Sequence, residues 1–196
     1  MQLSKLTEIL KETVITGSLN ADVTGISQDS RQVTKGCLFV ALPGTLTDGH
    51  LFIRQAAENG AVGVVFQRDC LEDRSVIDSL SGRTAFIEVP DTHQALGWLA
   101  DAFYDHPSAK MVLTGVTGTN GKTTTATLLY RMFGQMGYQC GLISTIANYV
   151  GTEQLPATHT TPDALTINSL LDRMCRCGCT HCFMEVSSHA AAQNRI

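Results

Sequence analysis

The stretch from Met111 to Thr125 constrains the fold of this chain more than any other part of its sequence. An apolar run leads into a turn rich in glycine and threonine, and an amphipathic helical pattern follows Gly121-Lys122-Thr123. This order predicts a strand, a phosphate-binding loop and a helix. The unpaired N–H groups and the positive dipole end at the start of such a helix would attract an anion.

Individual residues of this stretch support the phosphate-binding interpretation. Gly118 and Gly121 let the backbone approach phosphate oxygens without obstruction by a Cβ atom. Lys122 can reach the outer phosphates, and the hydroxyl of Thr123 can coordinate magnesium. The general motif has a glycine where this chain has Val116. The alternative is a glycine-rich turn beside a surface lysine, but the coincidence of strand, Gly-Lys-Thr and helix favours a phosphate site.

The composition is that of an ordinary globular chain, and it excludes several function classes. The 196 residues are 43% hydrophobic and 16% charged, with a formal net charge of −4. This charge gives no attraction to nucleic acid or to an anionic membrane, so neither is an expected partner. The first ten residues alternate apolar and polar positions at helical spacing, so we expect no signal peptide and no membrane insertion. The expected compartment is the cytoplasm.

Apolar runs and helix breakers predict two α/β domains, residues 1–108 and residues 109–196. The first is expected to alternate strands and helices, with buried strands at 37–42, 61–66 and 84–89. Asp48 is expected to begin a helix between the first two of these strands. The residues of that helix expected to face the core are Leu51, Phe52, Ala56 and Ala57.

The second domain is predicted to be an open parallel sheet with its ligand at the carboxyl ends of the strands. Apolar runs at 140–146 and 181–186 predict two strands after the phosphate loop, with a polar loop following Ile146. Thr161 is expected to cap the helix between these strands. The stripe of the phosphate-loop helix expected to face the sheet is Ala126, Leu129, Met132, Phe133 and Met136.

Three polar segments are expected to converge at one edge of this sheet. They are the phosphate loop, Thr160-Thr161, and the segment from Glu185 to His189. There the carboxylate of Glu185 could hold Mg²⁺ next to Thr123, and Ser187 and His189 could contact another ligand or ion. The alternative is that Glu185 is a buried acid with a structural partner and His189 a loop residue.

The seven cysteines invite two interpretations. Cys175, Cys177, Cys179 and Cys182 lie close together with His181, which suggests zinc. The intervals of these four do not form a pair of Cys-x-x-Cys knuckles, and the odd total of seven cysteines in a chain expected to be cytoplasmic indicates reduced thiols. We therefore expect structural thiols and keep the metal site as the alternative.

Several motifs resemble those of the Mur ligases, ATP-dependent amino-acid ligases of bacterial cell-wall synthesis. The resembling segments are Asp29-Ser30-Arg31, Gly36–Ala41, Asp48-Gly49, Val116–Thr124, His159–Asp163 and Met184–His189. The last two are most similar to the members that add the third amino acid of the peptide. Folylpolyglutamate synthetase has a similar loop, but Gly-Ser normally follows its lysine, where this chain has Thr123-Thr124.

The resemblance implies a small amino-terminal α/β domain that binds a UDP-sugar, followed by a truncated P-loop-type parallel-sheet domain that binds ATP. The implied reaction joins an amino acid, meso-diaminopimelate or L-lysine, to UDP-N-acetylmuramoyl-L-alanyl-D-glutamate. ATP would phosphorylate the terminal carboxylate, and the incoming amine would attack the acyl phosphate. ATP and Mg²⁺ are the implied cofactors.

The resemblance also assigns roles to individual residues. The residues implied to hold the ATP phosphates are Gly118, Thr119, Asn120, Gly121, Lys122, Thr123 and Thr124, with Lys122 as the catalytic residue. The implied metal ligands are Thr123, Glu185 and, for a second Mg²⁺, His189. The residues implied to hold the sugar nucleotide and its peptide are Ser30, Thr45, Thr160, Thr161, Ser187, Gln193 and Arg195.

Members of this family are more than twice as long, so the resemblance implies an amino-terminal fragment that does not catalyse ligation by itself. The full-length protein is expected to be a monomer, whereas an open sheet edge could make the 196-residue chain self-associate. Two alternatives stay open. The chain could belong to another member of the same superfamily, or it could be a nucleotide-binding module without turnover.

Overall fold

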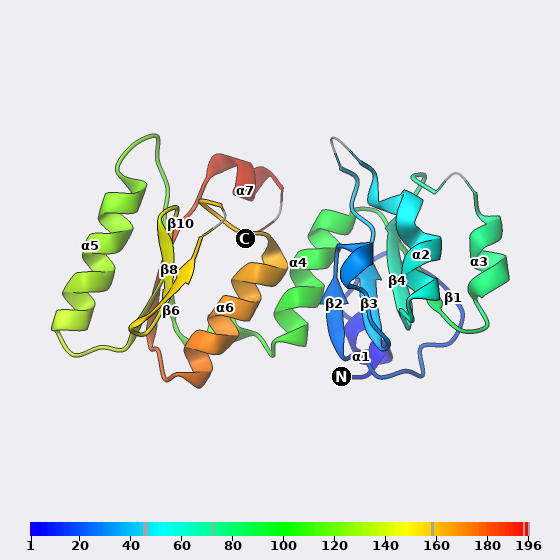
Figure 1. The fold of residues 1–196 in the computed structure, drawn as a ribbon, viewed down its shortest axis with the longest axis horizontal. Helices are drawn as coiled ribbons and strands as arrows, with labels where there is room; N and C mark the ends of the chain where they lie inside the picture. The colour runs from blue at the N-terminus through cyan, green and yellow to red at the C-terminus, as the bar shows by residue number, and fades with distance from the viewer. Residues whose placement is uncertain (45–46, 72, 158, 194, 196) are drawn as a thin grey trace. The chain divides into compact units, whose positions relative to one another are not determined.

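The computed structural model describes residues 1–44, 47–71, 73–157, 159–193 and 195. The chain forms two compact units, Met1–Leu99 and Ala100–Ile196, and the division between them falls within the sequence of helix α4 (Thr92–Phe103; Figure 1). Each unit contains a five-stranded sheet covered by helices. The predicted α/β class with parallel-strand sheets is therefore confirmed.

The sheet of the first unit has the strand order β1-β5-β4-β3-β2. Strands β2 to β5 run parallel, and β1 pairs antiparallel with β5. The elements of this unit, with η marking 3-10 helices, are α1 (Leu3–Thr7), β1 (Val14–Thr16), β2 (Gly25–Ser27), η1 (Ser30–Gln32), β3 (Cys37–Val40), η2 (Gly49–Phe52), α2 (Ile53–Glu58), β4 (Gly63–Gln67), α3 (Ser75–Leu80), β5 (Ala85–Val89) and α4 (Thr92–Phe103).

One core of this unit lies between the sheet and helices α2 and α3. Phe39, Phe66 and Phe86 come from three neighbouring strands and pack with Ile53 of α2 and Ile77 of α3. Each of these side chains is at most 8% exposed. Parallel strands covered on both faces read as continuous apolar runs, which is why the sequence located β3, β4 and β5.

The helix predicted from Asp48 begins differently, and the expected inward positions of Leu51 and Phe52 are wrong. Asp48 caps the 3-10 turn η2, where its side chain accepts a hydrogen bond from the N–H of His50, and α2 begins only at Ile53. A 3-10 turn has three residues per turn, so it shifts the phase of the helical face. As a result Leu51 is 73% exposed and Phe52 36% exposed, whereas Ile53 is buried.

The sheet of the second unit has the strand order β6-β10-β7-β8-β9. Strands β6, β10 and β7 are parallel, whereas β8 and β9 are antiparallel to their neighbours. The elements of this unit are η3 (Pro107–Lys110), β6 (Val112–Val116), α5 (Lys122–Gln135), β7 (Cys140–Ile143), β8 (Ala147–Val150), β9 (Glu153–Pro156), α6 (Ala164–Arg176), β10 (His181–Glu185) and α7 (Ser188–Ala192).

The polar loop predicted after Ile146 contains the hairpin of β8 and β9, so the sheet is mixed rather than wholly parallel. Gly151 has φ +58° at the first position of the two-residue turn between these strands. Glycine adopts this positive φ without the steric cost that a Cβ atom would add, which suits such a turn. Strand β7 also ends at Ile143, three residues earlier than its apolar run suggests.

Helices α5 and α6 cover opposite faces of this sheet (Figure 1). Leu142 and Phe183 pack with α5, whereas Ile143 and Met184, the next residues along the same strands, pack with α6. This alternation is the period of two expected of strands. Within the described residues, no helix combines the length and apolarity needed to cross a bilayer.

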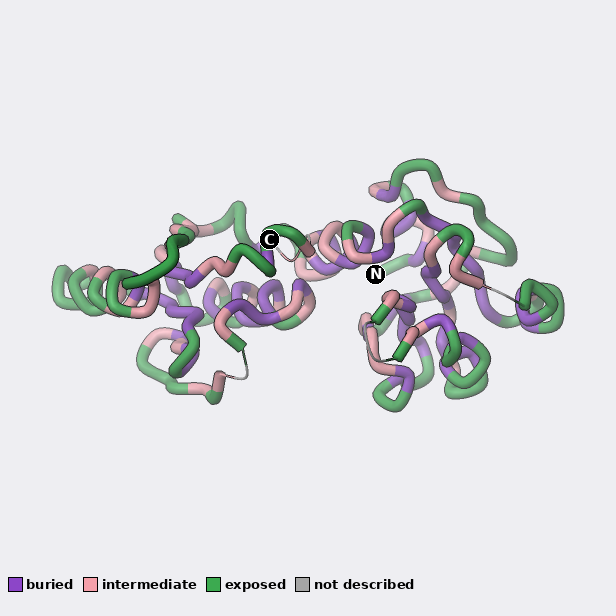
Figure 2. Tube along the Cα trace, turned by 90° about the horizontal axis from the view of Figure 1, so that it is seen from above, coloured by how far each residue is buried: buried purple, intermediate pink, exposed green. Residues whose placement is uncertain are grey.

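The predicted inward stripe of α5 is wrong for two of its members. Met132 is 48% exposed and Met136 63% exposed, and Figure 2 shows α5 largely exposed. Ala126 is the buried residue of this helix, with Leu129 and Phe133 partly buried against the sheet. The face of α5 that contacts the sheet is therefore narrower than the apolar spacing suggests, and it does not include Met132 and Met136.

Candidate functional site

The carboxyl ends of three parallel strands bring the predicted site segments to one edge of the second sheet. Glu185, the last residue of β10, is in register with Val116, the last residue of β6. Met184 is in register with Ile143, the last residue of β7. The loops that follow these three strands therefore start side by side, as the topology predicts for a ligand site.

The loop between β6 and α5 has the backbone expected of a phosphate cradle. Gly118 has φ +141° and Gly121 has φ +79°, and Gly121 is the N-cap of α5. A Cβ atom on Gly121 would meet nothing within 4 Å, so the backbone conformation, not crowding, requires glycine there. The ammonium of Lys122 donates to the carbonyl of Gly118 at 2.8 Å, which places this lysine over its own loop.

The structure brings Thr123 and Glu185 together across the edge of the sheet. The hydroxyl of Thr123 donates to Oε2 of Glu185 at 2.8 Å, although 62 residues separate them in sequence. Glu185 is 1% exposed, whereas Thr123 is half-buried in the first turn of α5. A hydroxyl and a carboxylate are hard oxygen donors of the kind that Mg²⁺ prefers, so these two residues fit that ion.

Sequence reasoning missed Thr145, which also contacts Glu185. Its N–H donates to Oε1 of the carboxylate at 2.8 Å, and its hydroxyl lies 3.2 Å from Oε2. The prediction of a strand through Ile146 placed Thr145 inside the sheet, where it could not reach the site. The available signal was the rule that polar residues directly after a parallel strand line the ligand edge.

Thr161 is not the helix cap that the sequence predicts. Asp163 is the N-cap of α6, because its side chain accepts a hydrogen bond from the N–H of Thr166 at 3.0 Å. The buried hydroxyl of Thr161 donates to the carbonyl of Glu185 at 2.9 Å and accepts from the N–H of Ser187 at 3.0 Å. Thr161 thus ties the start of α6 to the end of β10.

Two further predicted residues lie around Thr161. Ser187 caps α7, where its side chain accepts a hydrogen bond from the N–H of Ala190. The guanidinium of Arg195 donates to the carbonyl of Thr161 at 3.2 Å. Thr161, Ser187 and Arg195 therefore form one polar cluster beside Glu185.

The remaining predicted residues have different surroundings. Ser30 lies in the first unit, is buried, and donates its hydroxyl to Oε1 of Gln55 at 2.9 Å. Thr45 lies outside the described residues. Thr160 is half-buried before α6, Gln193 follows the end of α7, and His189 is exposed in the first turn of α7.

Acidic and soft metal ligands do not gather elsewhere in the part of the chain that the structure describes. No group of three or more His, Cys, Asp or Glu side chains there could hold a metal ion. Cys179 and Cys182 are buried, Cys175 is half-buried and Cys177 is exposed. Burial raises the pKa of the Cys175, Cys179 and Cys182 thiols.

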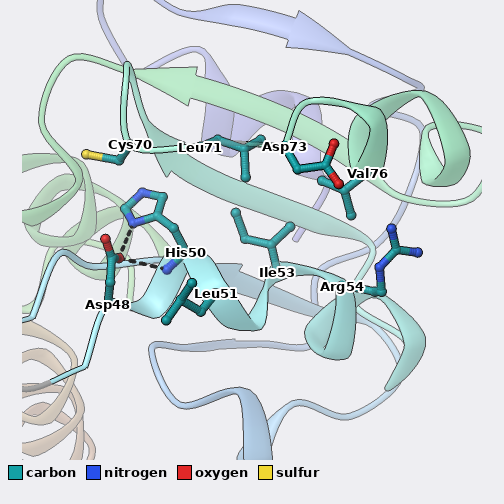
Figure 3. Close-up of a pocket in the computed structure, with 9 residues that line it drawn as sticks. All are labelled: Asp48, His50, Leu51, Ile53, Arg54, Cys70, Leu71, Asp73 and Val76. Atoms are coloured by element: carbon teal, nitrogen blue, oxygen red, sulfur yellow. Dashed lines mark hydrogen bonds and ion pairs between the residues drawn. The ribbon is translucent and has the colours of Figure 1, made fainter.

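The first unit has a separate pocket of about 240 Å³ beside η2 and α2 (Figure 3). Its buried His50 accepts the N–H of Gln67 at Nε2, 2.9 Å away, so Nδ1 carries the proton shared with Asp48 at 2.5 Å. Burial raises the pKa of Asp48, but hydrogen bonds from His50 outweigh this and leave it below its ordinary value. Asp48 and His50 thus fix the turn that precedes α2.

Comparison with known families covers most of the chain. Residues 22–104 match a family described as "Mur ligase family, catalytic domain". Residues 116–196 match a second one, described as "Mur ligase middle domain". The first match covers β2 to β5 of the first sheet, and the second covers β7 to β10 of the second sheet.

Curated relatives match the chain over its whole length. Those from Parabacteroides distasonis and Cytophaga hutchinsonii are each 50% identical over 196 residues, and both are named UDP-N-acetylmuramoyl-L-alanyl-D-glutamate–2,6-diaminopimelate ligase. The chain covers 39% of each of these relatives.

Solved structures show the same likeness. One of a protein with the same name aligns with a TM-score of 0.76 at 26% identity, over 100% of this chain and 37% of its own. A MurF ligase from Thermotoga maritima in complex with ADP aligns over 82% of this chain and 31% of its own, with a TM-score of 0.51 at 25% identity.

Proposed function

This chain belongs to the Mur ligase family, and we propose that it carries the UDP-sugar site and part of the ATP site of a ligase of peptidoglycan synthesis. The reaction joins an amino acid to UDP-N-acetylmuramoyl-L-alanyl-D-glutamate with ATP in the cytoplasm. The names of the relatives at 50% identity support 2,6-diaminopimelate as that amino acid. In this proposal residues 1–108 bind the UDP-sugar, and residues 109–196 form the first part of the ATP-binding domain.

In this reaction the γ-phosphoryl group of ATP moves to an oxygen of the substrate's terminal carboxylate, and ADP leaves. The amine of the incoming amino acid then attacks the acyl carbon, the C–O bond to phosphate breaks, and the amine loses a proton as the amide forms. Both reactants carry negative charge, so the site must offset that charge to bring them together.

In this proposal the residues at the edge of the second sheet bind ATP, Mg²⁺ and the sugar nucleotide. The N–H groups of Gly118 to Thr124 surround the phosphates at the start of α5, and Lys122 exchanges its contact with the Gly118 carbonyl for a phosphate oxygen. Thr123 and Glu185 hold Mg²⁺, which supplies charge neutralisation between ATP and the carboxylate. The sugar nucleotide and its peptide arm are held by Thr160, Thr161, Ser187, Gln193 and Arg195.

Two parts of this proposal come from the resemblance alone. His189 holds a second Mg²⁺ in the complete site. Ser30 and Thr45 contact the UDP portion of the sugar nucleotide. The contact between Thr123 and Glu185 is the observation that carries the proposal, because it sets a metal-binding pair of oxygens at the mouth of the phosphate loop.

Calorimetric titration tests the proposal with ATP and with UDP-N-acetylmuramoyl-dipeptide. We expect ATP to bind, and Lys122→Ala to weaken ATP affinity at least about tenfold through loss of a charge-assisted contact. Lys110→Ala, at an exposed lysine paired with Asp105, is the matched control and should leave ATP affinity unchanged. Equal ATP affinity in the wild type and Lys122→Ala would contradict the phosphate role.

The sugar nucleotide separates this function from the alternatives. A folate-type ligase of the same superfamily would bind ATP but ignore UDP-N-acetylmuramoyl-dipeptide. A nucleotide-binding module without turnover would bind ligands, yet its full-length form would release no phosphate when the amino acid is added. Binding of the dipeptide substrate together with phosphate release by the full-length protein would support the ligase.

A further inference from the structure

The turn after β7 is held by two buried polar side chains. Ser144 donates its hydroxyl to the carbonyl of Ala147 at 2.7 Å, and its N–H donates to Oδ1 of Asn148 at 3.2 Å. Ser144 is 2% exposed and Asn148 4% exposed. Because these bonds fix the backbone on both sides of Thr145, its N–H has a defined direction.

Thr145 contacts both oxygens of the Glu185 carboxylate. Its N–H reaches Oε1 at 2.8 Å and its hydroxyl reaches Oε2 at 3.2 Å. Two donors on the two oxygens of one carboxylate restrict rotation of the carboxylate plane, as a bidentate contact does. Thr145 is itself exposed, so it contributes little to the core and its main contacts are with Glu185.

The contact with Thr145 leaves one acceptor position of the Glu185 carboxylate free. A carboxylate can accept about four hydrogen bonds, two at each oxygen. The hydroxyls of Thr123 and Thr145 occupy both positions of Oε2, and the N–H of Thr145 occupies one position of Oε1. One acceptor position therefore remains, and it is on Oε1.

Among the described residues, the charge of Glu185 has no cationic partner. In the described part of the chain, no ion pair involves Glu185, and the nearby Lys122 donates to Gly118 instead. A buried carboxylate held only by neutral donors keeps its negative charge available to a cation. A purely structural acid would be expected to have a cationic partner.

We propose that Thr145 is a positioning residue for the divalent cation of the ATP site. It holds the Glu185 carboxylate so that the remaining acceptor position of Oε1 takes the metal, while the Thr123 hydroxyl stays bonded to Oε2. This inference rests on the proposed function, because the cation is the one that accompanies ATP. Outer partners that orient a metal ligand typically change metal affinity about 10- to 100-fold when removed.

Electron paramagnetic resonance of Mn²⁺ tests this inference without measuring activity. Mn²⁺ takes the same oxygen ligands as Mg²⁺, and its free and bound forms are distinguishable. Binding of Mn²⁺ in the presence of ATP is compared for the wild type, Thr145→Val, which keeps the N–H but loses the hydroxyl, and Thr145→Ser, which keeps both. Thr152→Val, in the β8–β9 turn, is the matched control.

We expect Thr145→Val to bind Mn²⁺ about tenfold more weakly, with Thr145→Ser and Thr152→Val within twofold of the wild type. ATP affinity measured in EDTA should be the same in all four proteins. Unchanged Mn²⁺ affinity in Thr145→Val would overturn the inference, and so would an equal loss of ATP affinity in EDTA, since that marks a general loop defect. A wild type that binds no Mn²⁺ with ATP would overturn the proposed function itself.

Discussion

Two buried carboxylates, one in each unit, are stabilised in opposite ways. Glu88, in β5, is 7% exposed and receives two guanidinium groups, from Arg68 at 3.2 Å and from Arg74 at 2.7 Å. Glu185, at the end of β10, is 1% exposed, and its donors among the described residues are the hydroxyl of Thr123 and the hydroxyl and N–H of Thr145. Both lie at or next to the last residue of a strand, and they differ in their partners.

The comparison shows that burial alone does not identify a functional acid. Removing a carboxylate from water is unfavourable unless hydrogen bonds or charges compensate it. At Glu88 cations compensate the charge, and the same contacts tie the segment after β4 and the start of α3 to the sheet. At Glu185 the donors among the described residues are neutral and leave one acceptor position of Oε1 open, which suits a residue that meets a metal ion.

The largest expected effect is on metal binding by Glu185→Gln. An amide has no negative charge and offers one acceptor oxygen, so Mn²⁺ affinity in the presence of ATP should fall about 100-fold. Electron paramagnetic resonance measures this directly. Glu88→Gln is the matched control and should bind Mn²⁺ as the wild type does; an equal fall in both variants would remove the distinction between the two acids.

The next effect is on stability and should be larger for Glu88→Gln. Its removal leaves Arg68 and Arg74 without their counterion, but their side chains are 42% and 59% exposed and can turn to water. We therefore expect a loss of about 2 kcal/mol in unfolding free energy, below the range for a fully buried pair. Urea unfolding at pH 7 measures it. If Glu185→Gln proved the more destabilising, Glu185 would be the structural acid.

The sequence predicts the parts of the site that depend on regular strand topology. Parallel strands end at one edge, so Thr123 and Glu185 were expected to be neighbours, and they share a hydrogen bond. Thr145 was missed because its strand ends where Ser144 turns to bond with Asn148, a contact that the apolar pattern does not record. The apolar pattern of a sequence does not predict the end of a strand when a side-chain contact of this kind sets it.

The partners of Glu88 show the same limit in the first unit. A glutamate inside the apolar run 85–89 indicates that something must compensate it. Arg68 and Arg74 come from a polar segment without periodicity, so no pattern connects them to that strand. In both units, the contacts that could not be predicted from the sequence are mostly tertiary contacts made by irregular segments.

A third acid, Asp48, extends the comparison and carries the smallest expected effect. Its side chain is 41% exposed and bonds to the N–H and to Nδ1 of His50, so it differs from the other two in its much greater exposure to water. Burial raises its pKa, but the hydrogen bonds from His50 lower it further than that, so the folded value lies below the unfolded one of 3.8. Its contribution to stability is therefore complete above pH 4 to 5 and is lost as the pH falls through the folded pKa.

Asp48→Asn keeps the acceptor oxygen and removes only the charge, so it isolates this contribution. At pH 7 the variant should lose about 0.5 kcal/mol of unfolding free energy, discounted for solvent screening, and at pH 3 the difference should shrink toward zero. Urea midpoints measured every half unit between these pH values follow the change, with exposed Glu58→Gln as the control. A difference that stays constant to pH 3 would mean that the charge of Asp48 contributes nothing to stability. Asp48 could then not be compared with Glu88 and Glu185 by the charge of its carboxylate.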